Sequence, residues 1–295
     1  ETGTYLTFTN DRHGFRNPTA VWDQDSVELM INGDSFTHGS CVPQEFSLAD
    51  QLRKKYPELV NIGIGHRGPL LELATWLEYA PPMKPKLTLW FIYGSNDLVN
   101  LASWRHNPLL QRYLKSKGFN QGLFQKPDVI EDSMSIYVEG LLNSGKAYPS
   151  SASLFFDFIL LRPLRDKFRL NLTGILDRPE SLEEMLPVIP EIQDIFLRAK
   201  EKAATWNGEI VFVYLPSIHQ MLSGTGKSQE EGVRDAMLES MVQIGVRHID
   251  LTKVFASDPN PEDNLWHFPG SHYSEKGYAL AAEGTLRALQ AAGAQ

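Results

Sequence analysis

The stretch at residues 27–39, VELMINGDSFTHG, begins with an apolar run at 27–31 and ends in a polar loop rich in small residues. Two runs of similar character are LTLWFIY at 87–93 and IVFVYL at 210–215, and weaker ones lie at 59–64 and 246–251. Runs that are apolar on both faces are typical of parallel strands that helices cover on each side. The sequence therefore predicts a central parallel sheet made of these five segments.

Segments with helical spacing of apolar residues separate these runs, at 46–56, 70–79, 192–206, 230–244 and 274–292. Ser47 and Ser274 stand where the first and last of them begin, and a hydroxyl there can accept a hydrogen bond from a free backbone N–H. Gly293 stands at the end of the last one. Strand alternating with helix predicts a three-layer α/β/α, flavodoxin-like architecture, which we expect to form one domain over residues 1–295.

Residues 100–186 interrupt this alternation. The segment is long, punctuated by proline and rich in helical patterns. We predict a helical insertion that forms a cap or rim at the sheet, and the alternative is that it only packs on the core.

Composition excludes several classes of function. The 295 residues carry a formal net charge of −8 and contain no basic block, which argues against a nucleic-acid partner. No apolar run reaches the roughly 18 residues that span a bilayer, so we expect no integral membrane segment. Cys41 is the single cysteine, and we expect a packed residue there rather than a nucleophile. The sequence contains no paired-histidine metal motif and no dinucleotide-binding glycine pattern, so we expect neither metal nor cofactor.

Polar residues follow the predicted strands. Ser35 comes after the first, Asn96 after the third, and His272 stands before the last helix. Active groups of open α/β sheets gather at the carboxyl ends of the strands. A serine that attacks an ester carbonyl, a histidine that takes its proton and amide donors that hold the oxyanion are the components of acyl transfer. Each residue also has an ordinary reading, as a turn, a helix cap or a surface histidine. Asp34 is expected to support its turn rather than to react.

Four blocks occur in the order found in one enzyme family: GDSFTHG at 33–39, NIGIGHRGP at 61–69, GSND at 94–97 and HYSEKGY at 272–278. In this the sequence resembles the SGNH or GDSL-type serine hydrolases. The resemblance implies that Ser35 is the nucleophile, that its backbone N–H and the Asn96 amide are oxyanion donors, and that His272 is the base. The segments TNDRHGFRN, VFVYLPS and GVRHIDLTKVF also resemble bacterial members linked to O-acylation of envelope polysaccharides.

Two positions depart from the family pattern. In the second block the family usually has a glycine five places after the asparagine, where this chain has His66, so the backbone N–H of His66 or of Gly68 is the expected donor. The family also usually has an aspartate two or three residues before the histidine, where this chain has Gly270 and Pro269. A backbone carbonyl could orient His272 instead, or a carboxylate of Asp263 or Glu262 could. Otherwise the protein no longer hydrolyses esters.

Three functions stay open on these grounds. The first is a serine esterase that removes acetyl or short acyl groups, with the resemblance pointing to a carbohydrate. The second is an O-acyltransferase to a polysaccharide hydroxyl, and the third is a non-catalytic binding module. The expected partner is an acylated small molecule or glycan. A location outside the cytoplasm, periplasmic or secreted, is implied by the resemblance alone.

Overall fold

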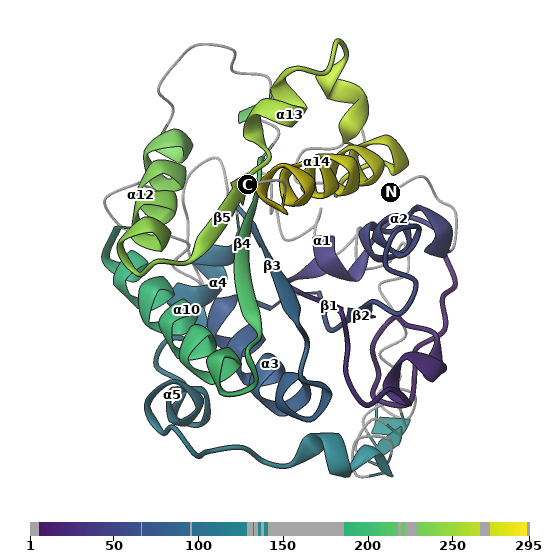
Figure 1. Ribbon diagram of the computed structural model, residues 1–295, viewed down its shortest axis with the longest axis vertical. Coiled ribbons are helices and arrows are strands. Elements are labelled where there is room, and N and C mark those ends of the chain that lie inside the picture. The colour runs from purple at the N-terminus through teal and green to yellow at the C-terminus, as the bar shows by residue number, and fades with distance from the viewer. Residues whose placement is uncertain are drawn as a thin grey trace, which may run out of the picture. The chain divides into compact units, whose positions relative to one another are not determined.

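A single parallel sheet organises the computed structural model, with the strand order β2-β1-β3-β4-β5 (Figure 1). Its strands are β1 (Leu29–Asn32), β2 (Val60–Asn61), β3 (Leu87–Tyr93), β4 (Glu209–Leu215) and β5 (Arg247–Asp250). All five predicted strands are therefore present, although β2 and β5 are shorter than predicted and β1 begins at residue 29 rather than 27. The order is that of flavodoxin-like sheets, and it confirms the predicted fold class.

The structure describes residues 6–65, 67–94, 96–128, 186–217, 220–221, 229–265 and 272–293, with a few single residues between 132 and 140. The chain divides into two compact units, one of residues 1–124 with 179–295 and one of residues 125–178. Helices α4 (Asp97–Trp104) and α5 (Pro108–Lys115) pack on α3 (Pro69–Met83) within the first unit. Residues 129–185 of the predicted insertion lie almost entirely outside the described residues, so a cap or rim there stays a prediction.

Helices cover both faces of the sheet (Figure 1). On one face α3, α10 (Ile189–Ala203) and α12 (Gln229–Gln243) pack side by side. On the other face α14 (Glu275–Gly293) packs on α2 (Leu48–Arg53) and α13 (Thr252–Ala256), and the short α1 (Ser35–His38) packs on α2. Among the described helices, none combines the length and the apolar character that a bilayer crossing requires.

Alternation along the strands assigns side chains to the two faces. Trp90 points toward α3 and α10, where its indole nitrogen donates to Glu72 Oε2 at 2.6 Å and its ring packs on Phe196. The odd-numbered residues of β1, β3 and β4 join the opposite core with α2 and α14, including Leu29, Ile31, Leu89, Phe91, Val211, Val213, Leu52 and Tyr278. Both faces are thus apolar, which is why the strand sequences lack a polar side.

Two predicted caps are confirmed. Ser47 Oγ accepts from the backbone N–H of Asp50 at 3.3 Å at the start of α2, and Ser274 Oγ accepts from that of Gly277 at 3.2 Å at the start of α14. Gly293 is the last residue of α14 rather than the residue beyond it. The cap at Ser274 fixes where α14 begins, and hence where His272, two residues earlier, lies.

Gly33 joins β1 to α1 at a point with no space for a side chain. Its φ is +149°, and a Cβ there would lie 2.3 Å from Thr37 Oγ1 and 2.6 Å from the carbonyl oxygen of Phe91. We predict that Gly33→Ala lowers the free energy of unfolding by about 3 kcal/mol or more, through overpacking and backbone strain together. Urea unfolding measures this. Gly118→Ala is the control because a Cβ there meets nothing within 4 Å; equal losses for both variants would contradict the prediction.

Candidate functional site

The site lies where the strand order reverses. The chain passes from β1 to β2 on one side and later from β3 to β4 on the other, so the direction of the strand order changes between β1 and β3. Ligands of open α/β sheets bind outside the carboxyl ends of the strands at such a point. Ser35 begins α1 just after β1, and Asn96 precedes α4 just after β3. These two predicted site residues, 61 positions apart in sequence, therefore meet at the switch point of the sheet.

Asp34 joins them. Its Oδ2 accepts from Asn96 Nδ2 at 3.1 Å and from Ser35 Oγ at 3.4 Å, and its Oδ1 accepts from the backbone N–H of Phe36 at 2.9 Å as the cap of α1. Asp34 is buried. Burial raises the pKa of its carboxyl to about 6, and these hydrogen bonds oppose the rise. Asp34 does support its turn, as predicted, and it also holds Asn96 beside Ser35, which the sequence did not reveal.

Ser35 is accessible although its neighbours are not. It is partly exposed, whereas Asp34 and Phe36 are buried. A distance of 3.4 Å is long for an O–H···O hydrogen bond, so its hydroxyl is held only weakly by Asp34. A Cβ on Gly65 would lie 3.5 Å from Ser35 Cβ, so the loop that follows β2, called the second loop, comes close to Ser35 at a glycine.

Asn96 retains hydrogen-bonding capacity beyond Asp34. An amide nitrogen carries two hydrogens, and the bond to Asp34 uses one of them. Its Oδ1 is buried and has no hydrogen-bond partner among the described residues. The second N–H is available to an anionic oxygen near Ser35.

His272 comes to the same end of the sheet from the other end of the chain. Its ring centroid lies 4.9 Å from that of Phe36, the residue after Ser35, and its Nδ1 lies 3.3 Å from Cys41 Sγ. The next residue, Tyr273, is fully buried, and its hydroxyl donates to the carbonyl oxygen of Pro216 at 2.8 Å. With the Ser274 cap, this anchor fixes the backbone on the C-terminal side of His272.

A second histidine lies near the site but is poorly suited to act as a base. His38 is partly buried, and its Nδ1 lies 3.4 Å from Ser40 Oγ. Burial, and then the charges of Arg16 and His272, lower the pKa of His38 to about 4. A general base works best when its pKa is near the working pH, so His38 is a weak candidate at neutral pH.

The remaining predicted site residues are less closely connected. His66 lies outside the described residues. Gly68 lies at the start of α3, where a Cβ would meet Asn100 at 2.6 Å. Asp263 Oδ2 lies 3.8 Å from Lys276 Nζ, and Glu262 precedes Asp263 in the short helix Pro261–Asn264. Among the described residues no group of three histidine, cysteine or acidic side chains is arranged to hold a metal ion.

A buried glutamate behind the site makes stability depend on pH. Burial, with a contribution from Asp34, raises the pKa of Glu72 to about 8, although Trp90 and Arg67 oppose the shift. Because the folded state holds this proton more tightly than the unfolded state, its contribution to the free energy of unfolding is full below the unfolded pKa of the carboxyl. That contribution is lost as the pH rises toward 8. We predict that Glu72→Gln becomes more stable relative to wild type between pH 5 and 8, by up to about 1.4 kcal/mol per pH unit. Urea unfolding across that range measures it, and a difference that does not change with pH would contradict it.

The chain matches neither a family model nor any curated protein sequence in the comparisons. It is similar to solved structures. One is a member of the lipolytic protein G-D-S-L family from Veillonella parvula DSM 2008, at 12% identity and TM-score 0.44, covering 89% of this chain and 97% of that one. Another is the psychrotrophic esterase EstA from Pseudoalteromonas sp., at 9% identity and TM-score 0.47, covering 92% and 100%. A third is an acetyl xylan esterase, at 12% identity and TM-score 0.47, covering 89% and 99%.

Proposed function

We propose that this chain is a serine esterase that removes acetyl or short acyl groups, with Ser35 as nucleophile and His272 as base. The supporting observation is the hydrogen bond between Asn96 and Asp34 across the switch point, which holds an amide donor beside an accessible serine. His272 packs on Phe36, one residue from that serine. A carbohydrate as the acylated substrate is supported by the resemblance of the sequence motifs alone.

The first half-reaction transfers the acyl group to the enzyme. Ser35 Oγ exchanges its weak bond to Asp34 for one to His272 Nε2, which accepts its proton as Oγ bonds to the ester carbonyl carbon. The carbonyl oxygen becomes an anion that the free N–H of Asn96 and the backbone N–H of Ser35 stabilise, with a second-loop N–H as a further donor. Collapse of this intermediate breaks the bond to the alcohol, which leaves with the proton from His272.

The second half-reaction releases the acid. His272 takes a proton from water as the water oxygen bonds to the acyl carbon, and the same donors hold the oxyanion again. The bond to Ser35 Oγ then breaks and the proton returns to the serine. An O-acyltransferase would use the same acyl-enzyme with a sugar hydroxyl in place of water.

The experiment is hydrolysis of aryl acetate and aryl butyrate, with the free acid quantified. We expect turnover above the buffer rate, and adding an acetyl-free glycan acceptor separates hydrolysis from transfer by the product formed. A folded chain that releases no acid and acylates no glycan would contradict the proposal and favour a binding module.

Removing the Asn96 amide tests the oxyanion role. We predict that Asn96→Ala lowers kcat about 10²- to 10³-fold with little change in KM, because the lost donor acts mainly on charge that develops in the transition state. Steady-state kinetics on the aryl ester measures this. The control is Gln193→Ala, in α10, whose exposed amide donates to Gln243 Oε1. Similar losses for both variants would argue against an oxyanion role for Asn96.

A further inference from the structure

The contact between Cys41 Sγ and His272 Nδ1 raises the question of what orients the base. For Nε2 to accept a proton from serine, Nδ1 must carry the ring hydrogen and needs an acceptor. The usual aspartate is replaced here by Gly270 or Pro269. Cys41 Sγ lies 3.3 Å from Nδ1, within hydrogen-bond reach for sulfur. We propose that the Cys41 sulfur accepts the hydrogen bond from His272 Nδ1–H and so positions the base; this rests on the proposed function.

The turn that carries Cys41 is fixed on both sides of the thiol. Arg16 donates from Nη1 to the carbonyl oxygen of Gly39 at 2.5 Å and from Nη2 to that of Val42 at 3.0 Å. The hydroxyl of Tyr278, in α14, donates to the carbonyl oxygen of Ser40 at 3.1 Å. Cys41 itself has φ +69°, a conformation that a non-glycine residue keeps only when its surroundings impose it. The backbone of Cys41 is therefore fixed, and this keeps its sulfur close to His272 Nδ1.

Arg16 is in turn held firmly. It is buried, and its Nε donates to Gln44 Oε1 at 2.6 Å. Its guanidinium carbon lies 4.8 Å from the ring centroid of Phe8. Burying a guanidinium is costly unless its donors are satisfied, and all three of its nitrogens donate here. The Arg16 guanidinium is thus fixed where it hydrogen-bonds to backbone carbonyls on both sides of Cys41.

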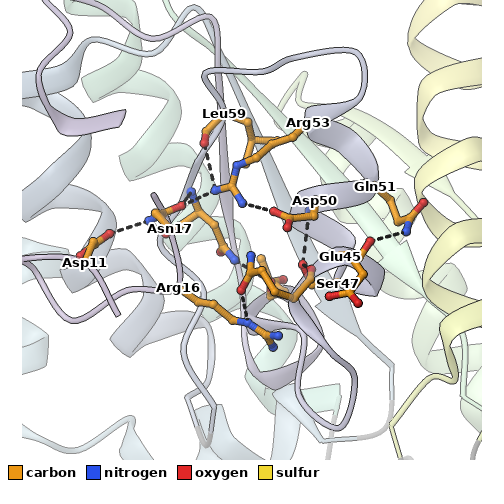
Figure 2. Close-up of polar contacts among 12 residues, drawn as sticks. Asp11, Arg16, Asn17, Glu45, Ser47, Asp50, Gln51, Arg53 and Leu59 are labelled. Carbon is orange, nitrogen blue, oxygen red and sulfur yellow. Dashed lines mark hydrogen bonds and ion pairs between the residues drawn. The ribbon is translucent and has the colours of Figure 1, made fainter. Parts of the chain in front are cut away.

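The neighbouring polar contacts tie the N-terminal segment to the rest of the unit. Asn17 Nδ2 donates to Asp11 Oδ2 at 2.8 Å, and Arg53 Nη2 donates to Asn17 Oδ1 at 2.5 Å (Figure 2). Arg53 also pairs with Asp50 within α2. The segment TNDRHGFRN, whose purpose its sequence did not reveal, thus buttresses the turn that faces His272.

The carboxylates predicted as orienters are less well placed. The side chain of Asp263 is 56% exposed and lies near Lys276. A thiol needs no compensating cation when it is partly buried, whereas a carboxylate there would. Cys41 therefore provides an acceptor that suits this turn.

Two readouts test the proposal, the tautomer of His272 and the kinetics. The chain is labelled with ¹⁵N-histidine, and His272 is assigned by comparison with His272→Gln. We expect the Nδ1–H tautomer in wild type and in Cys41→Ser, and a mixture with Nε2–H in Cys41→Ala. For Cys41→Ala we expect kcat to fall about 10- to 100-fold with KM nearly unchanged, and Cys41→Ser to recover most of it.

Cys41→Gly is the second variant, because glycine adopts the positive φ without strain and also removes the thiol. If alanine at this position impairs folding, Cys41→Gly should show the tautomer mixture and the loss of kcat expected for Cys41→Ala. Either readout unchanged in folded Cys41→Ala or folded Cys41→Gly overturns the proposal. If Cys41→Ser is inactive while Ser35→Ala is active, Cys41 itself reacts and the proposal also fails. If wild type hydrolyses no ester, the proposed function fails, and the tautomer alone then decides whether Cys41 orients His272.

Discussion

Ser35→Ala is expected to lower kcat for aryl-ester hydrolysis roughly 10⁴-fold or more, because no covalent intermediate can form without the hydroxyl. The fold should be unaffected. Ser35 is partly exposed, and among the described residues its side chain makes one long hydrogen bond, to Asp34. Removing such a bond changes the free energy of unfolding by at most about 1 kcal/mol. The measurement is initial rate against substrate concentration, with urea unfolding of the same preparations.

Ser103→Ala is the matched control, since Ser103 is an exposed serine whose hydroxyl donates to the carbonyl oxygen of Val99 within α4. It should retain wild-type kinetics. Hydrolysis by folded Ser35→Ala at the wild-type rate would remove Ser35 from the mechanism.

His272→Ala should cost nearly as much, about 10³- to 10⁴-fold in kcat, because a serine hydroxyl is a poor nucleophile without a base. His38→Ala is the informative comparison. His38 lies three residues after Ser35 in α1, but burial and then the charges of Arg16 and His272 lower its pKa to about 4. We expect a loss of less than about tenfold there, since so weak a base takes little of the proton in the transition state.

The comparison of the two histidines decides which of them is the base. Steady-state kinetics between pH 6 and 8 for both variants gives the answer. A larger loss in His38→Ala than in His272→Ala would assign the base to α1 and make the C-terminal block structural.

The strands could be predicted because burial on both faces leaves a simple signature. Each of the five apolar runs became a strand, and the serines at 47 and 274 became caps because their local hydrogen bonds depend on neighbours a few residues away. The sequence does not predict that Asp34 accepts hydrogen bonds from both Ser35 and Asn96. That role depends on which strands are adjacent, and adjacency is a property of the sheet rather than of any segment.

The sequence alone does not predict which group orients His272. Nearness in sequence favours Asp263 or Glu262 as the group that orients His272, but Asp263 lies beside Lys276. Cys41 lies 231 positions from His272, in a turn shaped by Arg16 and Tyr278. Its local sequence predicts only a small packed residue. Contacts of this kind arise from tertiary packing, and a single sequence carries no signal for them.

Reaction with a serine-directed aryl phosphonate tests the central claim most directly, because the reagent requires a nucleophilic serine and its base but no knowledge of the natural substrate. We expect one phosphonyl adduct per chain, located by peptide mass spectrometry on Ser35, absent from Ser35→Ala and formed much more slowly by His272→Ala. A folded wild-type chain that takes up no phosphonate, or takes it up on another residue, would contradict the account.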